Sequence, residues 1–308
     1  MKTNVHALGM FIRFSPKESA ASAFYQQKIE LPLIRVVGDH VADIYWGGEA
    51  SVFEIVFVKD KQPAPEPSPE TAPSVPVFRV SGLEAVLARL RSRGVVVTAI
   101  KPRGPGREAF FCDPDGYWVG LRERNKDSQL AHDVEARRRQ RRGETFNPGC
   151  KSMPDGIQEI GWVVRRVANL AAMTKFYSEV LGLEQIGEED GYVLFDLGDN
   201  GILELAPGGT SHSTPSDRYQ GTSAILFRVS DVAQVRANVT RCGGKIVNEK
   251  IPLHWAELTY FADPEGGVLG AEQGFHPGVY APEKFVLAEN LEAERRWREK
   301  QARDEGRG

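Results

Sequence analysis

The stretch that decides the fold is "IQEIGWVVRRVANLAAMTKFYSEVLGLEQIG", residues 157–187. Its first part is rich in Ile, Val and Trp, a composition that favours a strand. Apolar residues then recur at helical spacing, at Leu170, Met173, Phe176 and Val180. The stretch therefore predicts a strand, a turn and a helix that ends at Leu-Gly-Leu.

The chain repeats this pattern. "FFCDPDGYWVGL" (110–121) matches "YFADPEGGVLGA" (260–271), and "FIRFSPKESAASAFYQQKIEL" matches part of the opening stretch at an offset of 152 residues. The two copies span about 5–125 and 157–275. Each copy divides again into two units of strand, helix and further strands, and Asp-Pro-(Asp/Glu)-Gly turns lie between strands. We therefore predict an α+β fold built from four βαβββ units.

The repeat also predicts how the chain is organised. We expect one domain at 1–125, a charged helical tail and linker at 126–156, a second domain at 157–275, and a charged C-terminal helix at 276–308. The tails interleave acidic and basic residues, which favours a solvated face or a helix packed across a boundary. The Pro-rich segment 61–76 is expected to form an extended, exposed connection.

Composition excludes several classes of function. The 308 residues carry a net charge of −3 and are 41% hydrophobic, as in a globular protein with no bulk attraction for nucleic acid. No apolar run approaches the roughly 20 residues of a membrane span. The three cysteines, Cys112, Cys150 and Cys242, are too scattered for a disulfide framework. We expect a cytoplasmic protein with no nucleic-acid or membrane partner, either a monomer or a homodimer.

Several short motifs carry a resemblance to a known family. They are Phe24-Tyr25 and Phe176-Tyr177, Leu181-Gly182-Leu183, Phe78-Arg79-Val80 and Phe227-Arg228-Val229, and the two Asp-Pro turns. In this order they resemble the vicinal oxygen chelate superfamily of glyoxalase I, bleomycin-resistance proteins, fosfomycin-resistance enzymes and extradiol dioxygenases. The resemblance covers about 240 of the 308 residues. It implies two tandem glyoxalase-like domains, in which paired units curl a sheet around a cavity.

The resemblance also implies where a metal ion would bind. In that family, three strands each supply one ligand. The corresponding positions are Met10, Val75 and Gly120 in the first domain, and Trp162, Ala224 and Gly270 in the second. Zn, Fe and Mn prefer imidazole and carboxylate ligands, and none of these six side chains provides one. We therefore expect no metal at the family site. No nucleotide motif points to another cofactor.

Strand alternation predicts the lining of the second cavity. Resemblance to the fosfomycin enzymes implies that Ala256, Leu258 and Tyr260 point inward, and His254 keeps their phase. Trp162, Val164 and Arg166 share a phase on the first strand of this domain. The matching residues of the first domain give a more apolar set: Met10, Ile12, Phe14, Phe110 and Glu108, if the last points inward. Glu204 is interpreted as an outward residue.

We assign roles within the second domain. His254 and Tyr260 are the candidate catalytic residues, His254 because imidazole titrates near neutral pH. Trp162 either plugs the core or stacks on a flat ligand, and Arg166 either caps the sheet edge or binds a carboxylate. The candidate substrate contacts are Trp162, Val164, Arg166, Ala224, Leu258 and Gly270.

These residues favour one function over three others. The first is a metal-independent enzyme that isomerises, epimerises or cleaves a small aromatic or polycyclic molecule by acid–base chemistry. A metal-free binding protein of the bleomycin-resistance type would share the same lining. A partner-binding module with filled cavities and a divergent dioxygenase with a different metal site remain alternatives. We favour the enzyme because His, Tyr and Arg fall in cavity-facing phases.

Overall fold

The computed structural model describes most of the two repeats. The described residues are 5–17, 19–37, 41–47, 51–63, 65–124, 156–189, 191–198, 201–252 and 256–274. The predictions made for the two charged tails and for His254 fall outside these residues.

The first repeat contains two βαβββ units. The first unit consists of β1 (Val5–Pro16), the helical turn α1 (Ala21–Ala23) with its continuation η1 (Phe24–Ile29), β2 (Leu33–Val37), β3 (Ala42–Trp46) and β4 (Val52–Val58). The second unit consists of β5 (Ser74–Val80), α2 (Leu83–Ser92), β6 (Lys101–Arg103), β7 (Gly106–Cys112) and β8 (Trp118–Arg124).

The second repeat has the same order. Its first unit consists of β9 (Ile157–Val167), α4 (Leu170–Leu181), β10 (Glu184–Glu189), β11 (Tyr192–Asp196) and β12 (Ile202–Pro207). A short helix η2 (Arg218–Gln220) precedes the last unit. That unit consists of β13 (Ser223–Val229), α5 (Val232–Arg241), β14 (Lys245–Pro252), β15 (Ala256–Ala262) and β16 (Val268–Gly274). The α+β fold with four βαβββ units is confirmed.

Local signals explain where the deciding helix begins and ends. The side chain of Asn169 accepts a hydrogen bond from the backbone N–H of Ala172, which caps the first turn of α4. Gly182 ends the helix with φ 66°, a left-handed conformation that glycine adopts without steric cost. Met173, Phe176 and other apolar residues of one face are buried. The predicted strand, turn and helix are all present.

The strands form two eight-stranded sheets that mix the repeats. Sheet A has the order β14-β15-β16-β13-β1-β4-β3-β2, and sheet B has the order β10-β11-β12-β9-β5-β8-β7-β6. In sheet A, β1 pairs antiparallel with β13, and Ile12 lies opposite Ala224. In sheet B, β5 pairs antiparallel with β9, and Val77 lies opposite Trp162. Each sheet therefore takes one unit from 1–125 and one from 157–275, whereas the sequence suggested a sheet within each domain.

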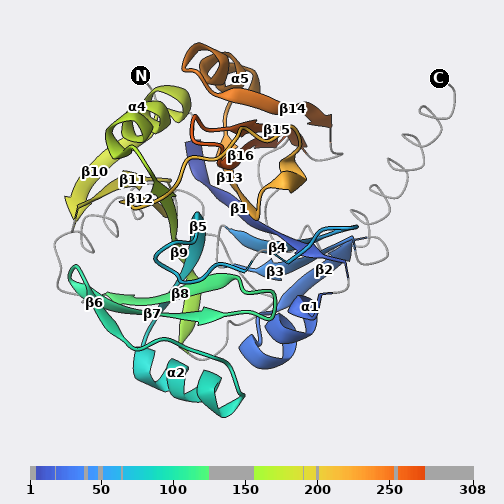
Figure 1. Cartoon of the computed structure of the whole chain (residues 1–308). Coiled ribbons are helices and arrows are strands. Elements are labelled where there is room, and N and C mark those ends of the chain that lie inside the picture. Colours follow the sequence, from blue (N-terminus) through green and yellow to red (C-terminus); the bar gives the residue numbers. More distant parts are fainter. Residues whose placement is uncertain are drawn as a thin grey trace, which may run out of the picture.

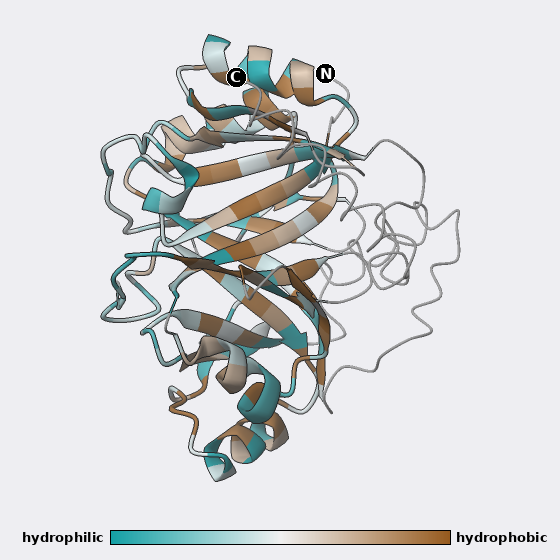
Figure 2. Cartoon of the chain, turned by 90° about the vertical axis from the view of Figure 1, so that its right-hand side faces the viewer, coloured by the Kyte–Doolittle hydropathy of each residue, from teal (hydrophilic) through white to brown (hydrophobic). Residues whose placement is uncertain are grey.

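The helices, in contrast, follow the repeats. Figure 1 shows α1 and α2 at one end of the molecule and α4 and α5 at the other. Arg93, which follows α2, pairs with Glu30 after η1 at 2.7 Å, and Asn238 of α5 donates to the carbonyl of Val180 in α4 at 3.1 Å. In Figure 2 the strands are predominantly brown, while the helices alternate between brown and teal, because one face of each helix meets solvent. No helix in the described part of the chain is long and apolar enough to cross a membrane.

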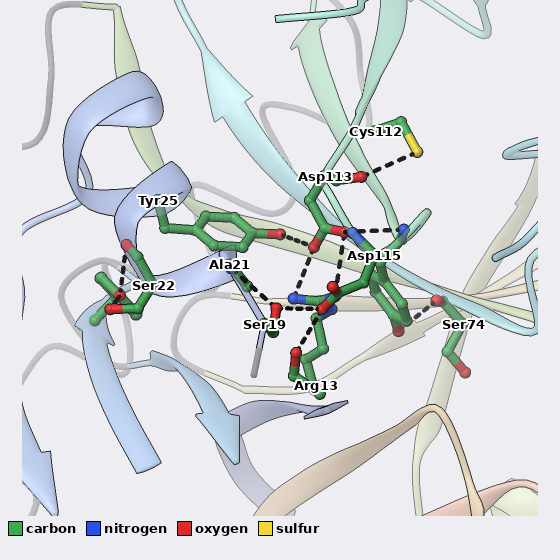
Figure 3. A network of polar contacts seen from close by, with 12 residues as sticks. Arg13, Ser19, Ala21, Ser22, Tyr25, Ser74, Cys112, Asp113 and Asp115 are labelled. Atoms are coloured by element: carbon green, nitrogen blue, oxygen red, sulfur yellow. Dashed lines mark hydrogen bonds and ion pairs between the residues drawn. The ribbon is translucent and has the colours of Figure 1, made fainter. Parts of the chain in front are cut away.

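A buried polar network ties sheet A to sheet B within the first repeat (Figure 3). Arg13 on β1 forms ion pairs with Asp113 at 2.8 Å and with Asp115 at 2.6 Å, both in the turn between β7 and β8. The Tyr25 hydroxyl donates to Asp113 at 3.0 Å, and the backbone N–H of Tyr117 donates to the same carboxylate. The Asp-Pro-Asp-Gly turn is thus an anchor between sheets as well as a change of direction.

The second repeat contains the same network. Arg165 on β9 pairs with Asp263 at 2.9 Å, and the Tyr177 hydroxyl donates to Asp263 at 3.3 Å. The backbone N–H groups of Glu265 and Gly267 also donate to the Asp263 carboxylate. Here the arginine comes from sheet B and the aspartate from a turn of sheet A, whereas in the first repeat the arginine comes from sheet A and the aspartate from a turn of sheet B. Both networks therefore connect the same two sheets.

The Pro-rich segment 61–76 contains a turn in which the backbone N–H groups of Thr71 and Ala72 donate to the carbonyl of Ser68, and it is only partly exposed. The indole N–H of Trp118 donates to the carbonyl of Glu66 at 2.9 Å. The guanidinium of Arg166 donates to the carbonyl of Pro69 at 2.9 and 3.1 Å. The expectation of an extended, exposed connection therefore holds only in part, because side chains of sheet B donate to carbonyls of this segment.

Candidate functional site

Each sheet has one face covered by the helices and one inner face turned away from them. The buried apolar residues on the inner face of sheet B are Ala72, Val75, Val77, Phe110, Trp162, Val164, Leu194, Ile202 and Ala206. Those on the inner face of sheet A are Ile12, Phe14, Ala224, Leu226, Ala256, Leu258, Tyr260 and Val268. Met10 lies beside this second group. The two inner faces are the candidate sites.

The six positions implied for metal ligands gather in two groups of three that differ from those expected. On sheet A the group is Met10, Ala224 and Gly270, from the adjacent strands β1, β13 and β16. On sheet B the group is Trp162, Val75 and Gly120, from β9, β5 and β8. Each group mixes the repeats, because the sheets do. The assignment of three positions to each domain is corrected accordingly.

These positions do not fit the family metal. A Cβ atom built on Gly270 would lie 2.7 Å from the Leu226 side chain, and one built on Gly120 would lie 2.7 Å from that of Val77. Apolar side chains thus occupy the space that a longer donor side chain would need. Within the described residues, no group of three or more His, Cys, Asp or Glu side chains could hold a metal ion.

On sheet B, four charged side chains of the inner face form ion pairs with one another, and Arg79 and Arg124 also lie at the Trp162 ring. Glu204 is 1% exposed and pairs with Arg122 at 2.7 Å and with Arg103 at 2.5 Å. Arg122 also pairs with Glu108 at 2.7 Å and lies 5.1 Å from the centre of the Trp162 ring. The interpretation of Glu204 as an outward residue was therefore wrong, because it continues the inner-face phase of its strand. Glu108 points inward, as considered above.

The pKa of Glu204 reflects this pairing. Burial alone would raise the pKa, but Arg122 and Arg103 outweigh it and hold the carboxyl below its usual range. Glu204 is therefore ionised at neutral pH and balanced by its partners. A face whose charges are already paired and whose centre is filled by Trp162 offers little to a ligand.

On sheet A, a tyrosine–arginine cluster lies on the inner face. The Arg218 guanidinium lies 5.0 Å from the centre of the Tyr260 ring and 4.6 Å from that of Tyr219. It donates to the Tyr219 hydroxyl at 2.5 Å. Tyr219 packs edge-on against Phe14, with ring centres 5.4 Å apart. In the described part of the chain, no carboxylate lies within ion-pair distance of Arg218.

The Tyr260 hydroxyl is the second notable group. Tyr260 is 4% exposed, and among the described residues no hydrogen bond reaches its hydroxyl. Burial raises its pKa well above the ordinary value; Arg218 opposes this shift, and Glu54 adds to it. Glu54 is half-buried on β4 and lies beside Ile12 in the inner-face phase. Because the ring is buried and the hydroxyl has no hydrogen-bond partner among the described residues, this phenol is a candidate ligand contact.

The predicted site residues are divided between the two faces. Ala224, Leu258, Tyr260 and Gly270 lie together on sheet A, and Trp162 and Val164 lie on sheet B with Arg166 on the same strand. The expected single cavity that would join Trp162 to Tyr260 is therefore not formed. The guanidinium of Arg166 donates to the carbonyl of Pro69 in the connecting segment.

Sequence reasoning missed Glu54, Arg218 and Tyr219. Glu54 interrupts the apolar residues Val52, Val56 and Val58 within a single strand phase, a signal that was available. Arg218 and Tyr219 precede β13 in an irregular connection, where no periodicity predicts which way a side chain points. Their place could not be read from spacing.

The described cysteines are poor nucleophiles at neutral pH. Burial is the main cause that raises the pKa of the Cys112 thiol to about 11, and Asp113 adds to it. Burial also raises the pKa of Cys242. Since the thiolate is the reactive form, neither thiol suits covalent catalysis.

The fold and both inner faces can now be compared with known proteins. The chain belongs to the Glyoxalase/Bleomycin resistance protein/Dioxygenase superfamily, whose pattern matches residues 9–121 and 159–269. This confirms the family that the sequence resembles. No curated protein matches the chain.

Two solved structures share the fold over most of the chain. A glyoxalase I mutant of Zea mays is 18% identical, covers 88% of this chain and 94% of its own, and gives a TM-score of 0.58. A putative dioxygenase of Bacillus subtilis is 15% identical, covers 92% of this chain and 91% of its own, and gives a TM-score of 0.60. An antibiotic-binding protein of Streptomyces is 24% identical and covers 39% of this chain and 96% of its own, with a TM-score of 0.31.

Proposed function

We propose that this chain binds a small aromatic molecule on the inner face of sheet A and moves a proton on it without a metal ion. The proposal rests on one contrast between the two inner faces. The ionised side chains of sheet B are paired with one another, whereas sheet A presents the Tyr260 hydroxyl with no hydrogen bond among the described residues. Tyr260 belongs to the apolar cluster of this face, and sites that bind largely apolar ligands have such a lining.

The chemistry that fits these side chains is enolisation beside a carbonyl group. The Glu54 carboxylate would take a proton from the carbon next to the carbonyl. The Tyr260 phenol would donate a hydrogen bond to the oxygen as negative charge develops there. A phenol keeps its proton at neutral pH even at its ordinary pKa, and burial raises the pKa of Tyr260 further, so the group stays a donor. Return of the proton to the same or another carbon completes exchange or isomerisation, with no oxidant or reductant needed.

A second candidate function is binding without turnover. The inner face of sheet A is apolar apart from a few groups, and a single carboxylate beside a phenol is a sparse catalytic set. Sequestration of an aromatic compound would use the same surface. His254, proposed from the sequence as a further acid or base, would favour the enzyme if its removal affected turnover.

Methionine methyl NMR tests the binding site without any substitution. Met10 lies at the inner face of sheet A, and Met173 lies in the helix-covered core. Addition of 2-tetralone, a bicyclic aromatic ketone, should shift the Met10 methyl signal through its ring current and leave that of Met173 in place. No shift at Met10 with this or any other member of an aromatic panel would contradict the proposed site.

Deuterium exchange tests the chemistry. In D2O, the protein should accelerate replacement of the acidic C–H protons of bound 2-tetralone, which mass spectrometry detects. Glu54→Gln should lower this rate by about 10²–10⁴-fold, the usual contribution of a general base. Tyr260→Phe should lower it while preserving the Met10 shift. Binding with no exchange above buffer would favour sequestration, and full exchange by Glu54→Gln would exclude that residue as the base.

Measuring the metal content of the protein tests the proposal that the reaction needs no metal ion. Untagged protein purified without chelators should contain far less than one equivalent of Fe, Mn or Zn by elemental mass spectrometry. The reason is the donor set, since Met10, Ala224 and Gly270 supply neither imidazole nor carboxylate. Near-stoichiometric metal that supports turnover and is lost with it on chelation would overturn the proposal.

A further inference from the structure

We infer that the ligand of sheet A carries one negative charge, in the form of an aromatic carboxylate whose oxygens are bound by Arg218. This inference rests on the proposed function and names the class of molecule that the same surface takes. Arg218 forms no ion pair with a carboxylate among the described residues, and its guanidinium meets Tyr260 on the inner face. Asp217, the preceding residue, acts on Arg218 through its charge without forming an ion pair with it, and its carboxylate accepts from the Tyr219 backbone. A half-buried cation without a direct ion pair gains when an anionic ligand binds it.

The Arg218 guanidinium is positioned by its neighbours and keeps N–H groups that can bind a carboxylate. Two tyrosine rings lie against it, with the Tyr260 and Tyr219 ring centres 5.0 and 4.6 Å from its central carbon. The hydrogen bond to the Tyr219 hydroxyl at 2.5 Å uses one of its nitrogen atoms, NH2. The remaining N–H groups can still donate to a planar carboxylate, which guanidinium recognises through two parallel hydrogen bonds.

The backbone beneath Arg218 is fixed from two sides. The Lys61 ammonium donates to the carbonyls of Tyr219 and Gly221, both at 2.9 Å. The Asp217 carboxylate accepts from the backbone N–H of Tyr219 at 2.7 Å. A binding group that is already ordered loses less entropy when its partner binds.

The surrounding charges favour a single negative charge over a phosphate dianion. Lys61 is engaged with two carbonyl groups, so among the described residues this segment offers one guanidinium to a ligand. Glu54 shares the inner face and influences the same phenol, which disfavours a second negative charge. The aromatic rings of Phe14, Tyr219 and Tyr260 provide edges and faces for a flat ring. An aromatic monocarboxylate carries a single negative charge and has a flat ring, so it matches both the charges and the aromatic lining.

A matched pair of ligands tests the inference. Isothermal titration calorimetry and the Met10 methyl signal would compare 2-naphthoate with 2-naphthamide, its uncharged analogue of the same shape. The wild-type protein should bind the acid about ten- to a hundredfold more tightly, as expected for a charge-assisted hydrogen bond. Arg218→Met should abolish this preference while leaving the affinity for the amide within about twofold. Arg218→Lys should restore part of it.

The control variant is Arg236→Met, which removes an arginine that pairs with Glu257 on the helix-covered side of sheet A. It should keep the preference for the acid. Equal affinity of the wild-type protein for both compounds, with Met10 shifted by each, would overturn the carboxylate inference and leave the proposed site intact. Failure of both compounds and of the neutral aromatic panel to shift Met10 would instead contradict the proposed function. A preference for the acid that persists in folded Arg218→Met would assign the charge recognition to another residue.

Discussion

Two glutamates at repeated positions show how strongly environment decides the role of a residue. Glu54 and Glu204 lie at the same point of their units, each in the middle of a strand and on an inner face. Glu204 is held between Arg122 and Arg103 and is fully buried. Glu54 is half-buried, and its charge acts on the Tyr260 phenol of the same face. The repeat therefore supplies the same chemical group twice, and the neighbours make one of them structural.

This contrast predicts different costs for the same substitution. Glu204→Gln leaves two buried guanidinium groups without a full counter-charge, and should lower the free energy of unfolding by about 3–5 kcal/mol. Glu54→Gln should lower it by about 1 kcal/mol or less, because a half-buried carboxylate keeps access to water. Urea unfolding followed by circular dichroism measures both. Equal losses would contradict the lower cost expected for the more exposed carboxylate.

The Cys112 thiol gives a prediction about pH. Its pKa of about 11 lies above the ordinary 9.0, so less thiolate is present in the folded protein at any pH below 11. At pH 8 the folded protein should react with iodoacetamide at Cys112 about a hundredfold more slowly than the unfolded chain, and the rate should keep rising up to about pH 11. Mass spectrometry of the peptide measures the labelling, with the chain in urea as the control. A rate that levels off near pH 9 would contradict the raised pKa.

Some of these residues were predictable and others were not. Ala256, Leu258 and Tyr260 follow strand alternation and lie on the face that the resemblance to the fosfomycin enzymes implied. Glu204 was misassigned because every residue from Ile202 to Ala206 is buried, and a strand buried on both faces carries no polar alternation to read. Arg218 lies in an irregular segment, where side-chain direction depends on tertiary contacts alone.

At the scale of elements, the Asp-Pro turns do more than reverse the chain. Asp263 accepts hydrogen bonds from the backbone of its own turn and pairs with buried Arg165 from the other sheet. Asp113 and Arg13 make the equivalent connection. Since both connections join sheet A to sheet B, each turn contributes to how the sheets are held together.

Removing one of these charges should destabilise the whole molecule. Asp263→Asn leaves Arg165 buried without an ionic partner, and should lower the free energy of unfolding by about 3–5 kcal/mol. The same change at Asp231, the N-cap of α5, should cost little, because asparagine caps a helix as well as aspartate does. Thermal and urea unfolding of the two variants provide the comparison. A small effect at Asp263 would show that the backbone hydrogen bonds alone hold the turn.

The sequence predicted the turns but not this use of them. Asp-Pro-(Asp/Glu)-Gly is a local turn signal that depends on a few neighbouring residues. The partner Arg165 lies about a hundred residues away, and nothing in its own strand distinguishes it from Arg166. Arg165 pairs with a buried aspartate while Arg166 donates to the backbone of Pro69. Long-range pairing of this kind leaves no local pattern.

At the scale of the whole molecule, the strands cross the repeats and the helices do not. The sequence indicates two repeats correctly, yet it cannot tell which units share a sheet. Pairing within a repeat or across repeats would bury the same apolar residues, because the four units have the same alternation. The structure shows pairing across the repeats, between β1 and β13 and between β5 and β9.

Cutting the chain between the repeats tests this arrangement. Residues 1–152 expressed alone contain one unit of each sheet, with β1 and β5 lacking their partner strands. This fragment should be aggregated or dimeric, because unpaired strand edges recruit other chains. Co-expression with residues 153–308 should yield a one-to-one complex with the spectrum of the intact protein, as measured by size-exclusion chromatography with light scattering. A stable monomeric fragment would show that each repeat folds by itself.

The pairing of strands across the repeats also determines when each sheet can form during synthesis on the ribosome. β5 meets β9 midway through translation, so sheet B can form while the chain is still growing. β1 is made first, yet its neighbour β13 is among the last segments made. At typical translation rates of 5–20 residues per second, β1 waits roughly 10–40 s before that partner is synthesised. The surface that we propose to bind ligand is therefore completed last, and a ribosome that stops early releases a chain in which it is missing.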